Sequence, residues 1–519
     1  MSAIINNTFR KFNADNFKAR FGVDKIYLMI GKNDAWSGAS LGEYTETAPS
    51  DTSIPVPIDT SVSLYNHYND MVAAKLISST SVSHILKRVN WTTGTVYFEY
   101  DHLQDDLIDE DFFVFTTAYR VYKCISNYNG AQSTVEPTGT SINIFDTADN
   151  YRWKFMFEVQ QADVLKFVTT DWIPVNAPAT SANAGQVLVE AAAVDGALEH
   201  IDVLSTVGSV TITAGGSSYS SVPTVAFSGG GGSGATGTAV VSSNAVASVT
   251  ITAIGSGYTS VPTVAFSGGG GTGAAGTAVL ATGGTGYRTN VGTAQAGAAT
   301  AITLASGASA VDDYYNSMTV YISSGTGNGQ FKTITDYVGS TKVATVSTWT
   351  TNPDNTSVYE VMPAVTIATS EGSGATARVS SITSGAINKV AMVTNGTLYR
   401  SGTATISSGG GTNAVLSARI GPVGGHGKDA VSELGGAFIM VNSRLIGNDG
   451  SDFPVGDDFR KVHLLVNPLV TADSSAATAS TYSGAEIKDD SGQIIYTEFR
   501  APINRASDST EDIKLVMEF

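Results

Sequence analysis

The sequence predicts a mainly β protein: a β-sandwich-type host fold with a few short helices that carries inserted small β-sandwich repeat modules. The first observation is a duplication with an offset of 39 residues. Residues 210–240 read VTITAGGSSYSSVPTVAFSGGGGSGATGTAV, and residues 249–279 read VTITAIGSGYTSVPTVAFSGGGGTGAAGTAV. Each copy alternates apolar with small polar residues and then breaks at four glycines, which is the pattern of strand, turn and strand. The second observation is composition. The chain has 55 glycines and only 14% charged residues, but its hydrophobic content of 42% favours folded β-structure over a disordered Gly/Ser linker.

Length and local composition divide the chain. At 519 residues it is longer than one ordinary domain of roughly 100–200 residues. Two compositionally ordinary parts bracket a Gly/Ser/Thr/Ala-rich block, and long insertions of this kind cost little closure entropy in an exposed connection. The predicted division is residues 1–195 (N-terminal half of the host fold), 201–290 (tandem repeats), 298–362 (a small β module), 363–420 (a degenerate third repeat) and 421–519 (C-terminal half).

The first part opens with two predicted helices and a strand. Phenylalanines recur near helical spacing in residues 8–21, with basic residues between them, which predicts an amphipathic helix. Residues 25–30 form a short apolar strand, and residues 71–86 are expected to form the second helix. Runs rich in aromatic and β-branched residues then predict strands at 95–100, 112–115, 119–125 and 151–159.

The inserted block is expected to contain only strands. In each repeat a tyrosine precedes a Val-Pro-Thr-Val strand, and we expect the ring to cover the apolar face of its own small sheet. Pro223 and Pro262 cannot donate a ladder hydrogen bond, so they belong at a strand start or a sheet edge. The small module has predicted strands at 318–323, 330–336 and 342–347, with a glycine-rich hairpin turn at 325–329.

Composition argues against several classes of function. The chain has 29 basic and 46 acidic residues, a net charge of −17, so broad binding to a nucleic-acid backbone is not expected. No run of about 20 apolar residues predicts a membrane span, and the N-terminus lacks the apolar core of a signal peptide. Cys124 is the only cysteine and lies in an apolar run, which favours a buried residue and assembly in a reducing cytoplasm.

No catalytic, cofactor or metal site is predicted. The six histidines form no HxxxH or HxH pair, and no Lys-Ser or Lys-Thr follows the polyglycine runs as in a phosphate-binding loop. Acidic clusters at 105–111 and 448–458 offer oxygen ligands for calcium but lack the spacing of a known loop. Residues 421–429, GPVGGHGKD, form the most unusual loop, where His426 is read as part of a glycine-rich connection that re-enters the host fold.

A series of short blocks in the two bracketing parts carries a family resemblance. Residues 31–37, GKNDAWS, look like a Gly-Arg-Ser-Glu-Pro-Trp-Ser segment, and residues 492–503, GQIIYTEFRAPI, give the nearest match. Together the blocks resemble the baseplate wedge subunit, the gene-eight product, of T-even-like contractile-tailed phages; residues 201–420 depart from it. The other blocks follow in family order: RVNW at 88–91, YRVYKC at 119–124, VEP at 135–137, YRWKFMFEV at 151–159, FRKV at 459–462 and VNP at 466–468.

The resemblance implies a structural protein of the virion. It implies a mostly β protein that dimerises, joins other wedge proteins around the tail tube, and has no catalytic residues to transfer. Assembly is expected in the cytoplasm of the host cell, without nucleic-acid or membrane partners. The candidate interface residues are Trp36, Ser37, Arg88 and Trp91, because tryptophan anchors cores and interfaces alike.

Two other functions remain open at this stage. A receptor-binding tail fibre or adhesin would use the repeats as a binding tip, and such fibres usually form trimers. A polysaccharide-cleaving enzyme would need a pair of carboxylates in a groove. The oligomeric state and an assay of polysaccharide viscosity separate these alternatives from the baseplate interpretation.

Overall fold

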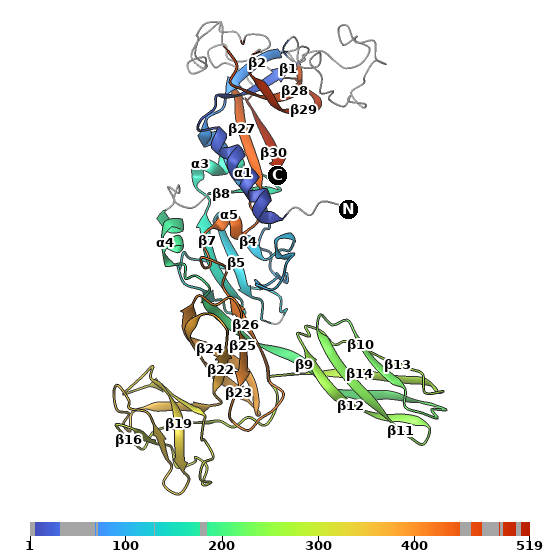
Figure 1. The fold of residues 1–519 in the computed structure, drawn as a ribbon, viewed down its shortest axis with the longest axis vertical. Helices are drawn as coiled ribbons and strands as arrows, with labels where there is room; N and C mark the ends of the chain where they lie inside the picture. The colour runs from blue at the N-terminus through green and yellow to red at the C-terminus, as the bar shows by residue number, and fades with distance from the viewer. Residues whose placement is uncertain are drawn as a thin grey trace.

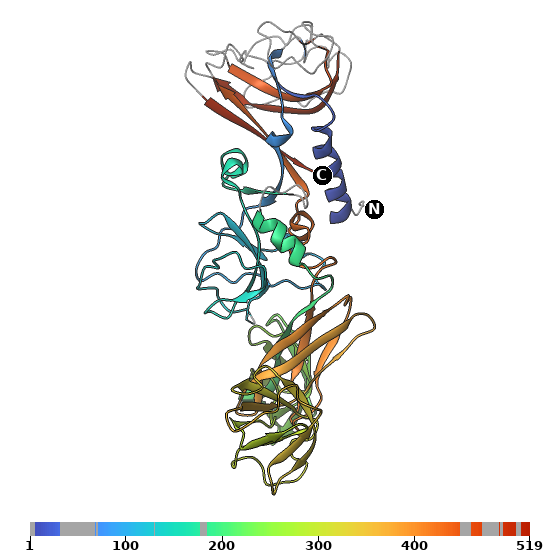
Figure 2. The same cartoon turned by 90° about the vertical axis from the view of Figure 1, so that its left-hand side faces the viewer.

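The structure, a computed structural model, describes residues 6–31, 68, 71–128, 130–176, 184–446, 458–469, 487, 491–504 and 510–519. The described molecule is elongated and consists mostly of antiparallel strands, which confirms the predicted mainly β class (Figures 1 and 2). We call residues 198–420 the arm and the other described residues the body. The body occupies the upper part of Figure 1 and the arm the lower part, where it divides into two branches.

Two sheets of the body combine strands from both ends of the chain. In the first sheet β1 lies between β2 and β28, and β29 follows β28. In the second, β27 lies between β3 and β30, and β8 follows β3. The N-terminal and C-terminal parts therefore share sheets. The bounds are β1 Ile26–Gly31, β2 Met71–Leu76, β3 Val82–Lys87, β8 Trp172–Val175, β27 Phe438–Ile446, β28 Asp458–Val466, β29 Gln493–Asn504 and β30 Thr510–Glu518.

Helix α1, Asn7–Arg20, confirms the first predicted helix and packs on β3 and β27 of the second sheet. The side chain of Asn6 caps it, accepting a hydrogen bond of 2.8 Å from the backbone N–H of Phe9. The ring of Phe17 lies 5.1 Å from that of Phe519, so the helix covers the chain's last residue. The hydrophobic core below α1 contains residues from both the N-terminal and the C-terminal part of the sequence.

The predicted helix over residues 71–86 is wrong. The chain forms β2, then the short 3₁₀ helix η1 (Ser79–Ser81), then β3. Ser78 caps the turn by accepting from the backbone N–H of Thr80, a local bond that competes with a longer helix. Residues 82–86 are buried between β27 and β8, so sheet pairing overrides the helical spacing of their apolar residues.

A third sheet, in the order β4-β5-β7-β6, forms the lower body and confirms three predicted strands. Its core is aromatic and includes the fully buried Trp153, Tyr122 and Phe155. The predicted strand at residues 95–100 is absent except for one bridge between Thr95 and Ser133. The elements are β4 Phe113–Phe115, β5 Arg120–Ser126, β6 Phe145–Asp146 and β7 Arg152–Glu158, with the helices η2 Leu107–Asp109, α3 Gln161–Phe167, α4 Ala184–Ala192 and α5 Ala430–Glu433.

The two sequence repeats form one unit, because each copy completes the other. The Thr-Val-Ala-Phe-Ser strands β10 and β13 pair antiparallel around Ala226 and Ala265. The last strand of the first copy pairs with the first strand of the second (β11 with β12), and β14 returns to pair with β9. Both prolines directly precede a strand, as predicted. The bounds are β9 Leu198–Ser217, β10 Thr224–Ser228, β11 Ser233–Ser242, β12 Ala245–Ser256, β13 Thr263–Ser267 and β14 Thr272–Thr282.

The repeat tyrosines reach across to the other copy. A Cβ built on Gly232 of the first copy would lie 2.6 Å from Cγ of Tyr258 in the second. A Cβ on Gly271 of the second copy would lie 2.5 Å from Cγ of Tyr219 in the first. Each ring therefore packs on a position of the other copy where only glycine fits. The expectation that each tyrosine covers its own sheet is corrected to an exchange between the copies.

The same contact occurs twice more in the rest of the arm. Tyr287 lies against Gly411, and Tyr399 against Gly372; a Cβ added to these glycines would lie 2.4 and 2.7 Å, respectively, from Cγ of the tyrosine. Two further copies therefore exist, and the third is interrupted between Tyr287 and Gly372. The single degenerate repeat expected at residues 363–420 missed this division, because the interruption hides the first part. The strands are β22 Val365–Ala368, β23 Ser373–Thr383, β24 Ala386–Thr397, β25 Thr403–Ile406 and β26 Val415–Ile420.

The interrupting module forms the other branch of the arm. Its seven strands surround a core that includes Trp349, Tyr337 and Tyr359. The predicted hairpin is confirmed, because β18 and β19 pair antiparallel. The strands are β15 Asn290–Thr293, β16 Ala296–Ala298, β17 Ala301–Thr303, β18 Thr319–Ser324, β19 Phe331–Val338, β20 Val343–Val346 and β21 Val358–Met362.

We expect the body to fold without the arm. The arm leaves and rejoins the body at one place, since Leu198 pairs with Ile420 and the N–H of Gly421 donates to the carbonyl of Ala197 at 2.8 Å. Replacing residues 201–420 by a short Gly/Ser linker should therefore give a soluble protein with a cooperative thermal transition by circular dichroism. An insoluble product would mean that the arm is part of the body's folding unit.

Candidate assembly surfaces and the cleft at the base of the arm

The structure describes two of the four predicted interface residues, Arg88 and Trp91. Trp36 and Ser37 lie outside the described residues. Arg88 is half-buried and held within its own chain: its Nε donates to Oδ1 of Asn90 at 2.8 Å and its Nη1 to the carbonyl of Thr169 at 2.6 Å. Its guanidinium also lies 5.3 Å from the centre of the Phe115 ring.

Trp91 is also engaged inside the body. Its Nε1 donates to Oγ of Ser133 at 3.0 Å, and its ring packs on the aromatic core. A role for Arg88 and Trp91 in an interface stays a prediction, and any partner would meet side chains whose positions are already fixed.

Sequence reasoning missed a more exposed surface on α1. Phe9 and Phe12 are 53% and 59% exposed, and Val23, just beyond the helix, is 85% exposed. With Ala19, which is also exposed, they are spaced by three, seven and four residues, which places them on one side of the helix and its end, and we call these four residues the α1 stripe. The spacing of the phenylalanines was visible in the sequence, but it did not tell which of them face solvent.

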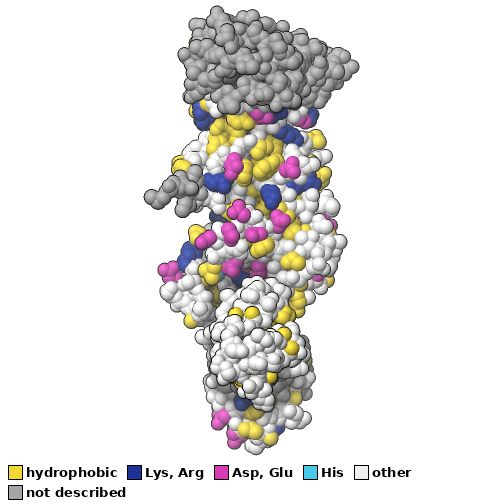
Figure 3. Space-filling view, turned by 90° about the vertical axis from the view of Figure 1, so that its right-hand side faces the viewer, with side chains coloured by type: hydrophobic (Ala, Val, Ile, Leu, Met, Phe, Trp, Pro, Cys, Tyr) yellow, Lys and Arg dark blue, Asp and Glu magenta, His cyan; other side chains and the backbone are white. Residues whose placement is uncertain are grey.

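The surface differs in character between body and arm. On the face drawn in Figure 3, hydrophobic, basic and acidic side chains crowd the described body, whereas most of the arm surface is neither charged nor hydrophobic. Interfaces are enriched in aromatic and Arg side chains. The surface of the body therefore has more of the side chains that typically form contacts with other proteins.

A buried arginine forms ion pairs between the arm and the body. Arg419 on β26 lies 2.6 Å from Oε1 of Glu99 and 2.7 Å from Oδ2 of Asp202, and its Nη1 contacts Asp101. Burial opposes its charge, but the three carboxylates outweigh burial and raise the pKa of Arg419. Glu99 and Asp101 belong to the body, so these ion pairs cross the junction.

A second series of polar contacts between body and arm lies beside the ion pairs of Arg419. Nη1 of Arg152 in the body donates to Nδ1 of His200 in the arm at 2.5 Å, and Nε2 of His200 lies 2.5 Å from Asp202. Burial alone would raise the pKa of Asp202, but His200 and Arg419 lower it to about 2. Asp146 binds both Arg152, at 2.8 Å, and Lys389 of the arm, at 3.5 Å.

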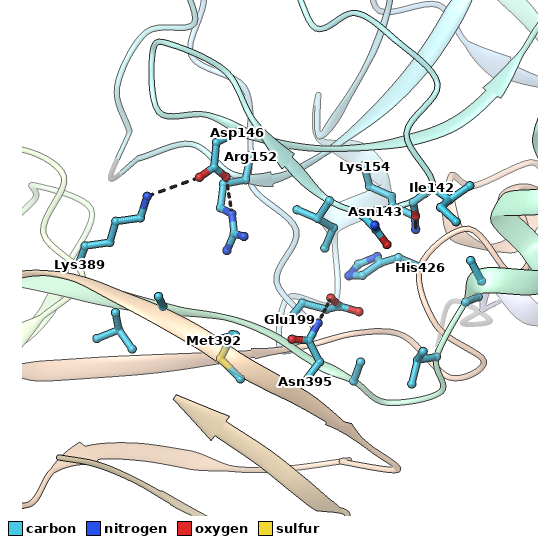
Figure 4. Close-up of a pocket in the computed structure, with 17 residues that line it drawn as sticks. Ile142, Asn143, Asp146, Arg152, Lys154, Glu199, Lys389, Met392, Asn395 and His426 are labelled. Atoms are coloured by element: carbon cyan, nitrogen blue, oxygen red, sulfur yellow. Dashed lines mark hydrogen bonds and ion pairs between the residues drawn. The ribbon is translucent and has the colours of Figure 1, made fainter. Parts of the chain in front are cut away.

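A cleft of about 410 Å³ opens next to these ion pairs, between β7 of the body and β24 of the arm (Figure 4). Burial raises the pKa of Glu199 and lowers that of Lys154. His426, from the glycine-rich loop at 421–429, also lines the cleft, and burial followed by the charge of Lys123 lowers its pKa to about 4. These side chains come from distant parts of the sequence, so no local motif could have predicted their meeting.

The described residues contain no group of three or more His, Cys, Asp and Glu side chains placed to hold a metal ion. The acidic cluster at 105–111 belongs to this described part, whereas most of the cluster at 448–458 lies outside it. None of the helices in the described ranges has the length and hydropathy of a membrane-spanning segment.

Comparison with known families supplies the decisive observation. Residues 439–519 match the family model described as "Bacteriophage T4, Gp8". This C-terminal segment of the chain is therefore similar to the Gp8 family. The matched segment begins within β27 and ends at the last residue, so it contains β28, β29 and β30. No curated protein matches the chain.

The match over this segment supports a structural protein of the phage baseplate, and a location in the virion fits it. The matched strands form the two body sheets together with β1, β2, β3 and β8. The arm, in contrast, lies outside the matched segment.

Proposed function

We propose that this protein is a wedge subunit that links neighbouring proteins of a contractile-tail baseplate. The observation that carries the proposal is the match over residues 439–519, whose strands are built into the same sheets as the N-terminal strands. The interactions reside in surfaces of the body, without catalysis, and the partners are other wedge proteins and a second copy of this chain.

The experiment that tests this function is a cryo-EM reconstruction of tails from the phage that encodes the chain. We expect density for the body within each baseplate wedge, in contact with at least two other proteins. Density only at the tips of fibres would reject the wedge function in favour of the alternative, a receptor-binding fibre or adhesin. Tails that assemble normally without the protein would also contradict the proposal.

The α1 stripe is our candidate for the contact between two copies. A double substitution, Phe9→Ser with Phe12→Ser, should convert a dimer into a monomer, as measured by light scattering after size-exclusion chromatography. Burial of one phenylalanine contributes about 1.5–3 kcal/mol, so losing two should weaken association by on the order of a hundredfold or more.

Leu103→Ser is the matched control, because Leu103 is an exposed apolar residue of the body outside the α1 stripe. A dimer that survives the double substitution would exclude the α1 stripe as its interface. A monomeric wild-type protein at micromolar concentration would refute the homodimer itself.

Trp36, Ser37, Arg88 and Trp91 are proposed as a second contact, with a neighbouring wedge protein. Trp36→Ala should reduce incorporation of the protein into baseplates several-fold while leaving its melting temperature unchanged, since interface tryptophans often dominate binding. Incorporation is measured by quantitative immunoblotting of purified tails. A lowered melting temperature would instead indicate that Trp36 packs on its own domain.

A further inference from the structure

His426 is a buried side chain that lacks a hydrogen-bond partner. It is only 2% exposed, and neither ring nitrogen has a partner among the described residues. Nδ1 lies 3.8 Å from Oε2 of Glu433, beyond hydrogen-bond range, and the Tyr100 ring packs edge-on against the imidazole at 4.6 Å. In Figure 4 the ring lies at the cleft beside Asn143, Lys154 and Glu199. Buried polar groups normally have hydrogen-bond partners, so the unpaired imidazole of His426 at the cleft indicates a binding site for a ligand.

We propose that the cleft at the base of the arm binds a neutral, hydroxyl-rich ligand, namely one or two units of a saccharide. The site is separate from the surfaces proposed for wedge assembly. It lies where the arm meets the body, and no sequence motif or family match assigns it.

The hydrogen-bonding groups at the cleft mix donors and acceptors. Neutral imidazole offers one donor and one acceptor, and Glu199 adds carboxylate acceptors. Lys154 has three donors, one of which reaches the carbonyl of Ile142 at 2.5 Å, and Asn395 donates to Oε2 of Glu199 at 3.1 Å. A hydroxyl group both donates and accepts, so a set of neighbouring hydroxyls satisfies such a mixture.

The charges at the cleft disfavour an ionic ligand. At the rim, Asp146 already pairs with Arg152 and Lys389, which leaves Lys154 and Glu199 as the other charged residues that line the cleft. An anion would meet the carboxylate of Glu199, and a cation would meet the ammonium group of Lys154. A neutral ligand meets neither repulsion.

Close packing at two glycines fixes the shape of the cleft. Gly425 has a φ of 93°, and a Cβ on it would lie 2.4 Å from the backbone N of Val194, so only glycine lets the His426 loop approach the wall this closely. A Cβ on Gly421 would lie 3.5 Å from both Oε1 of Glu199 and Cδ2 of His426, which places these two side chains together.

Volume and wall chemistry agree with a saccharide unit. The cleft of about 410 Å³ lies within the roughly 300–1,000 Å³ of small-ligand sites. Ile142, Val194 and Met392 supply apolar wall for the C–H faces of a sugar ring, next to the polar groups at His426.

The test uses the full chain and three probes: D-glucose, D-galactose and N-acetyl-D-glucosamine at millimolar concentration. Saturation-transfer difference NMR should show transfer to the ring protons of at least one sugar, and titration should give its Kd. Glu199→Gln and His426→Phe should each weaken that binding about tenfold or more, because each removes an acceptor while keeping the approximate shape.

Glu136→Gln, which changes an exposed carboxylate of the body, is the matched control and should leave the Kd unchanged. If His426→Phe fails to fold by circular dichroism, Asn395→Ala replaces it and should also weaken binding. No transfer to any of the three sugars would overturn the proposal. So would a Kd that Glu199→Gln leaves unchanged, or inorganic phosphate that binds in preference to the sugars.

Discussion

Glu433→Ala should destabilise the body by about 3–5 kcal/mol, because it leaves the buried ammonium group of Lys123 without its counter-charge. The side chains of Lys123 and Glu433 are 1% and 7% exposed, and Nζ lies 3.1 Å from Oε2. Oε1 of Glu433 also accepts from the backbone N–H of Gly427 at 2.8 Å. The pair connects β5 with α5, so it joins the N-terminal and C-terminal parts of the body.

The prediction is measured as the free energy of unfolding in urea. Arg120 and Glu158 form a more exposed pair at 2.8 Å, so Glu158→Ala should cost no more than about 1 kcal/mol. The double substitution Lys123→Met with Glu433→Leu should recover much of the loss, since it removes both charges. If Glu433→Ala costs as little as the exposed control, the pair does not hold the two parts of the body together.

The sequence predicted those features that depend on neighbouring residues. The helix α1 and strands β1, β5 and β7 follow from local periodicity, and the strand content of the repeats follows from their alternation. Residues 71–86 show the limit of this reasoning: their apolar spacing resembles a helix, but pairing of β3 with β27, more than 350 residues later in the chain, decides the outcome.

Contacts between distant residues were not predictable from one sequence. The repeat period predicted two similar units, but not that Tyr258 would pack on Gly232 of the other copy. The loop containing His426 stood out by its glycines, yet nothing in its spacing indicated Glu199 or Lys154 as neighbours. Folding of the arm against the body creates the cleft, so it has no linear signature.

Tyr258→Ala should destabilise the first pair of repeats by up to about 3–5 kcal/mol, as expected for removal of a large buried aromatic side chain. The ring is 3% exposed and lies in a core with Val207, which precedes the first copy, Phe227 of the first copy and Ala278 of the second. Its hydroxyl also accepts from the backbone N–H of Ala235 at 3.3 Å.

Hydrogen exchange in the full chain measures this change and tests the exchange of tyrosines between copies. Amides near Gly232 and Ala235 of the first copy should lose protection, although the substitution is in the second copy. Tyr258→Phe should cost only about 1 kcal/mol, because it removes one hydrogen bond and keeps the ring. Tyr128→Ala, an exposed tyrosine of the body, should leave the repeats unaffected. If loss of protection were confined to residues 249–279, each copy would fold on its own, because a ring that packs only within its copy cannot protect the other.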